Sequence, residues 1–342
     1  MKRILLICLF VVIVFAAIGA WILLGSATGF DDTKRTLYIR TDGATKTAVM
    51  DSLKAQHIIS NESAFNWIAE RMNYWDRVKP GKYDIKKGTN LLSIVRMLRN
   101  GQQTPVNFTI TKIRTNEDFA RLAGNKFEFD SLQMISFISN NDSLKPYSVQ
   151  TQEAMSIVLP DTYTFLWATS PRKVIKKLSD ENKKFWSDDR LARAKSLQLT
   201  PLQISTLASI VDEETNAVKE KGTVASVYMN RLKKGIPLQA DPTVKFALRD
   251  FGLKRIYEKH LFTESPYNTY RNKGLPPGPI CTPSKKTIDA VLNAPATDFI
   301  YFVASPKFNG EHEFSATYAE HLLKAKQYQQ ELNHQDSIRK NR

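Results

Sequence analysis

The chain has 342 residues, of which 42% are hydrophobic, and its 49 Lys and Arg against 34 Asp and Glu give a formal net charge of +15. This length is sufficient for two or three small domains with cores of their own. The only cysteines are Cys8 and Cys281, which excludes an internal disulfide framework and a thiol-rich zinc site.

Residues 4–24 are the first predicted element, an apolar segment without a charge that follows two cations. A helix of this length spans ~30 Å at ~1.5 Å per residue, which matches the hydrocarbon core of a bilayer. Lys2 and Arg3 precede this segment, and the first charges after it are Asp31 and Asp32. This distribution of charge places residues 1–3 in the cytoplasm. We therefore expect a single-pass anchor in the cell (inner) membrane, with the chain beyond the linker 25–34 outside the cytoplasm. A cleaved signal peptide ending at residues 25–27 is the alternative, although its apolar region is usually shorter.

The expected location changes the interpretation of the net charge. A charge of +15 would first suggest nucleic acid. However, basic pairs such as Lys176-Lys177 and Lys233-Lys234 are dispersed, with acids between them. Beside a membrane, an anionic envelope polymer or lipid headgroups are better partners than nucleic acid, and most of the charge is ordinary solvated surface.

Residues 35–103 are predicted to form a small α+β subdomain. Its second half reads as a strand, a turn at Gly88 and a helix that closes near Gly101. This half resembles a LysM-like glycan-binding module, and a plain α+β subdomain is the alternative. The expected elements are a strand at 36–40, amphipathic stretches at 48–59 and 62–72, a short strand ending at 86, and a helix with apolar positions from 91 to 98.

A mixed α+β domain is predicted over residues 104–326. A polar tail, expected to be frayed, follows at 327–342. The expected elements before residue 200 are a strand at 106–110, a helix at 118–123 capped by Asn116, a helix at 132–138, a loop at 150–167 and one long charged helix from Pro171 to Leu197.

A helix over residues 200–216 carries the most informative side chain. Thr200 as N-cap, Pro201 at the first helical position and Gln203 in a capping box mark its start. At about 100° per residue, its apolar residues share one face, and Glu214 projects from the middle of that face. Asp212 and Glu213 turn away from it. The apolar residues of this face are Ile204, Leu207, Ile210 and Val211.

The position of Glu214 predicts acid chemistry. A carboxyl group held against apolar neighbours loses hydration, which raises its pKa and keeps it protonated near neutral pH. A general acid that protonates a glycosidic oxygen needs this property. The alternative is a half-exposed carboxylate, or one paired with a nearby cation such as Arg231.

The segments after a second predicted helix at 223–234 suit sugar binding. Two loops, at 237–244 and 265–280, are rich in Pro and Gly and carry amide, hydroxyl and aromatic side chains. A strand at 301–304 follows. The groove candidates are Gln239, Asp241, Asn268 and Tyr270; their alternative role is to bind backbone groups of the loops, or, for Asp241 before Pro242, to start a turn.

His312 and His321 lie near the C-terminus without the second histidine that a His-Glu-x-x-His zinc site needs. We therefore expect no metal and no cofactor. The two histidines are expected to order the C-terminal strand and helix around the cleft.

In their order, several motifs resemble the YceG-like (MltG) endolytic murein transglycosylases. They are Ala-Ser-Ile-Val-Asp-Glu-Glu-Thr, Asn-Arg-Leu, Leu-Gln-Ala-Asp-Pro-Thr-Val, Ser-Pro-Tyr-Asn-Thr-Tyr with Gly-Leu-Pro-Pro-Gly-Pro-Ile, Tyr-Phe-Val-Ala, and His-x-Phe-Ser with Glu-His. The resemblance is dense over residues 207–321. It implies a membrane-anchored lyase, with its catalytic domain outside the cytoplasm, that cuts nascent peptidoglycan strands and leaves 1,6-anhydro-N-acetylmuramic acid ends. It also implies a place beside peptidoglycan synthases, where the cut terminates strand growth.

The resemblance also implies roles for single residues. The second Glu of the family's Glu-x-Glu-Thr motif is the catalytic acid and matches Glu214, while the first is Asp212 here. Two departures concern substrate contacts. The family commonly has Gln-Thr-Asp-Pro where this chain has Ala240 in second place, and a Pro-Glu-Gly turn where this chain has residues 111–115.

Two other functions remain open at this point. A water-using muramidase would employ Glu214 as acid and Asp241 as base. A glycan-binding scaffold that recruits cell-wall synthases would need neither.

Overall fold

The computed structural model describes residues 2–340, except for the side chains at 2, 16, 18, 20, 22, 23, 336, 339 and 340. The fold is mixed α+β, as predicted, and each sheet among the described residues has two strands. The chain divides into two compact units. The first comprises the chain up to Phe108 with Gly124–Asp130 and Thr164–Ser170, and the second comprises Thr109–Ala123, Ser131–Tyr163 and the chain from Pro171 onward.

Helix α1 (Lys2–Leu24) contains the segment predicted to span a membrane. Its described apolar side chains are exposed, for example Leu5 at 75% and Phe10 at 67%. Judged on the described residues alone, none of the helices reaches the length and apolar character that crossing a membrane requires. Part of the predicted segment 4–24 lies outside the described side chains, at positions 16, 18, 20, 22 and 23.

The first unit is built on an antiparallel pair of strands. β1 (Lys34–Ile39) pairs with β2 (Gly81–Lys86) in a register that places Leu37 opposite Tyr83, and both side chains are fully buried. Asparagine or threonine caps start the three helices that share a hydrophobic core with this pair. These helices are α2 (Lys46–Ala55, cap Thr45), α3 (Glu62–Arg71, cap Asn61) and α4 (Leu91–Asn100, cap Asn90), with a short η1 (Trp75–Arg77) between the last two.

β3 (Val106–Ile110) and β4 (Asp161–Phe165) form a second two-stranded sheet, in which the chain passes from one unit to the other. The prediction of a loop at 150–167 was wrong, because this stretch contains η3 (Thr151–Ile157) as well as β4. The alternating pattern of β4 extends over only five residues, too few to distinguish it from a loop by sequence.

Two further predictions need correction in the helices of the second unit. Thr115, not Asn116, caps α5, because its hydroxyl accepts a hydrogen bond from the amide of Asp118 at 3.0 Å. The predicted long helix is two helices, since Ser187 adopts an extended N-cap conformation before two acidic residues. The helices are α5 (Asn116–Gly124), α6 (Ser131–Ile138), α7 (Asn141–Leu144), α8 (Pro171–Phe185) and α9 (Asp188–Ser196), with η2 (Lys145–Tyr147) after α7.

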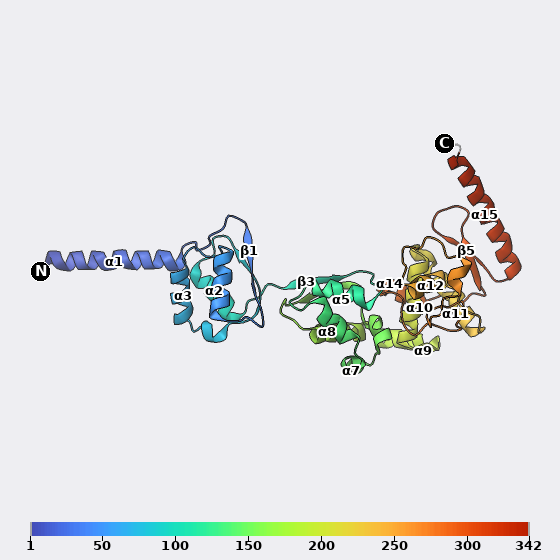
Figure 1. Cartoon of the computed structure of the whole chain (residues 1–342), viewed down its shortest axis with the longest axis horizontal. Coiled ribbons are helices and arrows are strands. Elements are labelled where there is room, and N and C mark those ends of the chain that lie inside the picture. The colour runs from blue at the N-terminus through green and yellow to red at the C-terminus, as the bar shows by residue number, and fades with distance from the viewer. Residues whose placement is uncertain (1, 341–342) are drawn as a thin grey trace. The chain divides into compact units, whose positions relative to one another are not determined.

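Helix α10 (Pro201–Glu214) is the central helix of the second unit (Figure 1). Its predicted cap is confirmed: the Thr200 side chain and the Gln203 side chain form a capping box, with Pro201 at the first position. The helix is buried on all sides from Ile204 to Asp212, so the single apolar face expected from its sequence underestimates its burial. It packs against α11 (Lys221–Lys233), α12 (Asp241–Leu248) and α14 (Lys285–Leu292), with η4 (Val218–Glu220) leading into α11 and α13 (Glu258–Leu261) following α12.

The C-terminal part forms a hairpin and a long helix. β5 (Tyr301–Ala304) pairs antiparallel with β6 (His312–Ser315), and α15 (Tyr318–Lys340) packs on both strands (Figure 1). The prediction of a frayed tail from residue 327 was wrong for the described residues, since α15 continues to Lys340. Part of this helix is held by packing, as in the ring contact of Tyr328 with Phe308 at 5.7 Å.

Candidate active site

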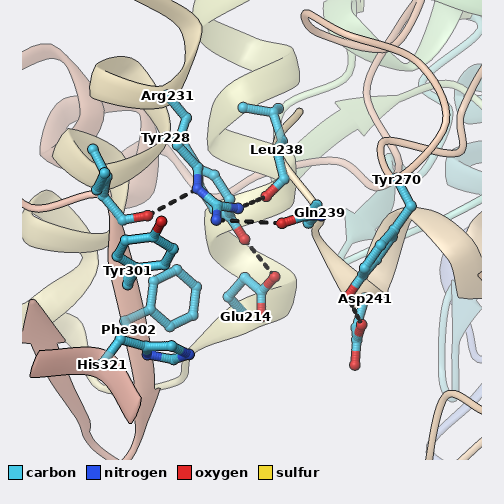
Figure 2. A pocket seen from close by; sticks show the side chains of 11 residues that line it. Glu214, Tyr228, Arg231, Leu238, Gln239, Asp241, Tyr270, Tyr301, Phe302 and His321 are labelled. Atoms are coloured by element: carbon cyan, nitrogen blue, oxygen red, sulfur yellow. Dashed lines mark hydrogen bonds between the residues drawn. The ribbon is translucent and has the colours of Figure 1, made fainter. Parts of the chain in front are cut away.

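Glu214 is the last residue of α10 and lies in a cleft of about 330 Å³. Its Oε1 accepts a hydrogen bond of 2.6 Å from the hydroxyl of Tyr228, which comes from α11 (Figure 2). Among the described contacts of the carboxyl group this is the one hydrogen bond, so the second oxygen is available to a ligand. The cleft is lined by Glu214, Tyr228, Arg231, Leu238, Gln239, Asp241, Tyr270, Ile300, Tyr301, Phe302 and His321.

The surroundings of Glu214 favour its neutral form. Burial raises its pKa from 4.5 to about 7, and the hydrogen bond from Tyr228 offsets part of this effect. The negative charge of Asp241 raises the pKa further, while Lys245 lowers it. The carboxyl group is therefore protonated in a large fraction of molecules near neutral pH, as general-acid catalysis requires.

Arg231 does not pair with Glu214, so the ion-pair alternative for this carboxyl group was wrong. The guanidinium group instead donates to the backbone oxygens of Ile300 at 2.8 Å and Leu238 at 2.6 Å, and to the Gln239 side chain at 3.3 Å (Figure 2). Arg231 thereby ties helix α11 to the residue that precedes β5 and to the loop with Leu238 and Gln239, and both segments line the cleft.

Three of the four predicted groove residues line the same cleft as Glu214. Gln239 lies beside Arg231, and Asp241 accepts a hydrogen bond of 2.6 Å from the hydroxyl of Tyr270 (Figure 2). Asp241 is also the first residue of α12, with Pro242 after it, so the turn proposed as its alternative role is a helix start. Its carboxylate and the Tyr270 ring form a polar wall opposite the aromatic side chains described below.

The structure does not bring Asn268 into the cleft. This side chain is fully buried, and its amide donates to the backbone oxygens of Leu261 at 2.9 Å and Thr263 at 2.8 Å. Its oxygen accepts from the amide of Tyr270 at 3.0 Å. Asn268 therefore organises the loop that presents Tyr270, which is the alternative role considered for it.

An aromatic wall was missed by the sequence reasoning. Phe302 meets the ring of Tyr228 edge-on at 5.8 Å, and Tyr301 stacks on the ring of His321 at 5.1 Å. Burial, together with Arg231, lowers the pKa of His321, so its ring is neutral at neutral pH. A strand at 301–304 was predicted, but a pattern of four residues gives no indication of which helix will cover it.

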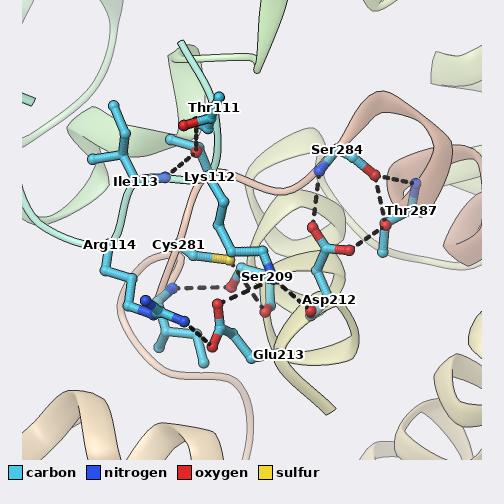
Figure 3. A network of polar contacts seen from close by, with 12 residues as sticks. Thr111, Lys112, Ile113, Arg114, Ser209, Asp212, Glu213, Cys281, Ser284 and Thr287 are labelled. Carbon is cyan, nitrogen blue, oxygen red and sulfur yellow. Dashed lines mark hydrogen bonds and ion pairs between the residues drawn. The ribbon is translucent and has the colours of Figure 1, made fainter. Parts of the chain in front are cut away.

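The three consecutive acids at the end of α10 have three different environments. Asp212 is buried in an ion pair with Lys221. It also accepts hydrogen bonds from Thr287 Oγ1 at 2.7 Å and the amide of Ser284 at 3.1 Å (Figure 3). Burial alone would raise the pKa of Asp212, but these hydrogen bonds hold it below its usual value. Asp212 is therefore charged, and it fastens α10 to α11 and α14.

Glu213 pairs with two cations from the segment that follows β3. Lys112 Nζ lies 3.3 Å from its Oε1, and the Arg114 guanidinium lies 2.9 Å from its Oε2 (Figure 3). Lys112 also donates to the backbone oxygen of Asp212 at 2.8 Å. This segment is where the sequence departs from the family's Pro-Glu-Gly turn, and it holds the last turn of the helix that carries Glu214.

His312 lies outside the cleft, in contact with Glu220. Its ring Nδ1 is 2.8 Å from Glu220 Oε1, and its backbone amide donates to Glu220 Oε2 at 2.9 Å. Across the part of the chain that the structure describes, no cluster of three His, Cys, Asp or Glu side chains has the geometry to hold a metal ion.

Most of the chain is similar to known proteins. The model of the YceG-like family matches residues 38–327. An endolytic murein transglycosylase of Bacillus subtilis (strain 168) is 28% identical over 314 residues, which cover 87% of this chain and 86% of that protein. A protein of the same name from Streptococcus pneumoniae (strain ATCC BAA-255 / R6) is 24% identical over 82% of this chain, and the match covers 57% of its length. The crystal structure of a YceG-like protein from Listeria monocytogenes superposes with a TM-score of 0.55 at 26% identity, over 85% of this chain and 99% of that one.

Proposed function

Since this chain belongs to the YceG-like family, we propose that it is a peptidoglycan lytic transglycosylase that cuts within glycan strands. The curated relatives are named endolytic murein transglycosylases, and one of them matches this chain over most of both lengths. The observation that carries the proposal is the state of Glu214, a carboxyl group whose pKa is raised to about 7 and which opens on a cleft walled by aromatic and polar side chains.

The proposed reaction needs one carboxyl group. Glu214 protonates the oxygen between N-acetylmuramic acid and N-acetylglucosamine, so that this bond breaks as C1 of the muramic residue gains oxocarbenium character. The resulting carboxylate then takes the proton of the 6-hydroxyl of the same residue, whose oxygen attacks C1. The products are a 1,6-anhydro end and a free 4-hydroxyl on the other fragment, and the acid regains its proton.

The neighbours of Glu214 support this cycle. The Tyr228 hydroxyl holds one carboxyl oxygen at 2.6 Å, which orients the other toward the cleft. The carboxylate of Asp241 favours the protonated acid before the reaction and stabilises positive charge on the sugar during it. In a water-using muramidase, the same Asp241 would have to activate water, although the Tyr270 hydroxyl already occupies one of its oxygens at 2.6 Å.

The proposal extends to the location of the enzyme. Residues 4–24 would form a single-pass anchor, with the N-terminus cytoplasmic and the chain beyond the linker 25–34 outside the cytoplasm. The 23-residue helix α1, its exposed apolar side chains and the cations at its start support this arrangement. The subdomain at 35–103 would act as a LysM-like glycan-binding module, and peptidoglycan synthases would be the partners whose nascent strands are cut.

The test is a product analysis of digested sacculi by mass spectrometry. Wild type is compared with Glu214→Gln and with a control, Glu264→Gln, whose side chain is 89% exposed. We expect 1,6-anhydro ends from wild type and the control, and none from Glu214→Gln. Reducing ends from wild type would identify a hydrolase instead. Rescue of a deletion strain by Glu214→Gln would identify a scaffold without a catalytic role.

A further inference from the structure

A second hollow lies next to the proposed catalytic cleft. It measures about 330 Å³ and is lined by Ala304, Ser305, Phe308, Gly310, Glu311, His312 and Tyr328. The wall between the two hollows is aromatic: Phe302 lines the cleft, His312 lines the second hollow, and their rings meet edge-on at 5.2 Å. The two hollows are therefore neighbours that share a wall.

The same two elements run along both hollows. Strand β5 contributes Tyr301 to the cleft and Ala304 to the second hollow, and helix α15 contributes His321 to the cleft and Tyr328 to the second hollow. Seven residues of helix advance by about 10 Å, and three residues of strand advance by about 10 Å. This separation is on the scale of a disaccharide, so the hollows have the spacing of successive positions on one glycan strand.

The second hollow has the surface chemistry of a sugar site. Phe308 is 45% exposed, and its ring contacts Tyr328 at 5.7 Å. Its backbone is left-handed, with φ at 49°, a conformation that non-glycine residues adopt at a cost. The strained turn presents the ring to solvent beside Glu311, which pairs with Lys219 and accepts from Asn309 at 2.7 Å. Aromatic faces with polar groups beside them are suited to sugar rings and hydroxyls.

We propose that this hollow is an outer glycan subsite, which binds the part of the same peptidoglycan strand that extends beyond the catalytic cleft. The proposal rests on the proposed function. A strand that also fills this hollow extends beyond the bond to be cut, so the enzyme would recognise an internal bond by it.

A chain of hydrogen bonds connects the outer subsite to the acid. His312 in its wall holds Glu220, and Glu220 Oε1 accepts a hydrogen bond of 2.5 Å from Thr215 Oγ1. Thr215 is the C-cap of α10 and directly follows Glu214. A strand bound against His312 would therefore hold the end of α10 in place, so that binding energy from remote sugars serves the reaction.

The test compares glycan strands of defined length, without stem peptides, as substrates for full-length wild type, Phe308→Ala and the control Phe262→Ala. Phe262 is an exposed aromatic residue, at 64%, that lines neither hollow. For Phe308→Ala we expect kcat/KM to fall roughly fivefold on long strands and to stay near wild type on the shortest strands that are cut. The control should match wild type on both. An equal loss on long and short strands, or no loss, would overturn the proposal.

A binding measurement separates this proposal from the proposed function. In the Glu214→Gln background, titration calorimetry with the same long strands should show the roughly fivefold weakening on adding Phe308→Ala, and none on adding Phe262→Ala. If wild type makes no anhydro ends, the proposed reaction fails while this titration still decides the outer subsite. Equal affinity of both double variants would mean that the hollow binds no glycan.

Discussion

The hydroxyl of Tyr228 on α11 donates a 2.6 Å hydrogen bond to Oε1 of Glu214 at the end of α10. Tyr228 is fully buried, and burial together with the nearby carboxylate keeps its pKa well above the usual value, so the phenol remains a donor. This hydrogen bond orients the carboxyl group of Glu214 and also stabilises its charged form. The balance between this bond and burial sets how readily Glu214 gives up its proton.

Tyr228→Phe removes this bond and leaves the ring packing in place. Because the bond lowers the pKa of Glu214, we expect the pKa to rise above its value of about 7 and the alkaline limb of the pH–rate profile to move to higher pH. We also expect kcat to fall about tenfold, since the carboxyl group is less well oriented and, with its higher pKa, is a weaker acid in the first step. The pH–rate profile of both proteins measures these changes. A lower kcat without a shift of the limb would assign Tyr228 a packing role only.

Glu214→Gln removes the acid and keeps the shape of the side chain. We expect release of anhydro products to fall by about 10²–10⁴, the usual contribution of general acid–base catalysis. The thermal midpoint should stay close to that of wild type near pH 4.5, where the carboxyl group of the folded protein is protonated and the neutral amide resembles it. Circular dichroism and product analysis on the same preparation check both expectations, and a folded variant with wild-type activity would exclude Glu214 as the acid.

The stability of the protein should depend on pH through the same residue. Its pKa is raised from 4.5 to about 7, so between these values the folded state binds more protons than the unfolded state. The free energy of unfolding therefore falls as pH rises through this range, by at most about 3 kcal/mol for this group. Urea unfolding of wild type and Glu214→Gln at several pH values measures this effect. The difference in the free energy of unfolding between the two proteins should shrink toward pH 4.5. Identical slopes for the two proteins would show that Glu214 ionises in the folded state as it does in water.

The ion pair of Lys112 with Glu213 can be tested by exchanging its charges. Lys112→Glu and Glu213→Lys should each lower activity, because either change places like charges beside the turn that carries Glu214. The double exchange restores one attractive pair, so we expect a coupling of about 1 kcal/mol in a double-mutant cycle on kcat/KM. Strict additivity of the two single effects would mean that the pair does not hold the acid.

Asp212→Ala should be the most destabilising of these changes. It leaves the Lys221 ammonium, 10% exposed, without its carboxylate partner. Breaking a buried ion pair in this way costs about 3–5 kcal/mol. Replacing both residues, as Asp212→Ala with Lys221→Met, removes the unpaired charge and should recover part of the loss. Thermal unfolding of the three proteins measures this, and a double variant less stable than the single one would contradict the account.

Local rules were sufficient for some of these features. Thr200, Pro201 and Gln203 determine where α10 begins, because N-cap and capping-box bonds are made within one turn of the chain. The helical period then places Glu214 among apolar neighbours. By contrast, the break before Ser187 and the strand β4 were missed, since short stretches carry too little pattern to outweigh their neighbours.

The sequence by itself determined the family, the central helix and its terminal carboxyl group. Only the tertiary structure decided which acid could stay neutral. Asp212 is buried and lies beside Lys221, whereas Glu214 is half-buried and lies beside the neutral hydroxyl of Tyr228. It also decided that His321 reaches the cleft and Asn268 does not. The reason is physical: a pKa depends on which charges and dipoles surround a buried group, and these come from segments far along the chain that no local pattern brings together.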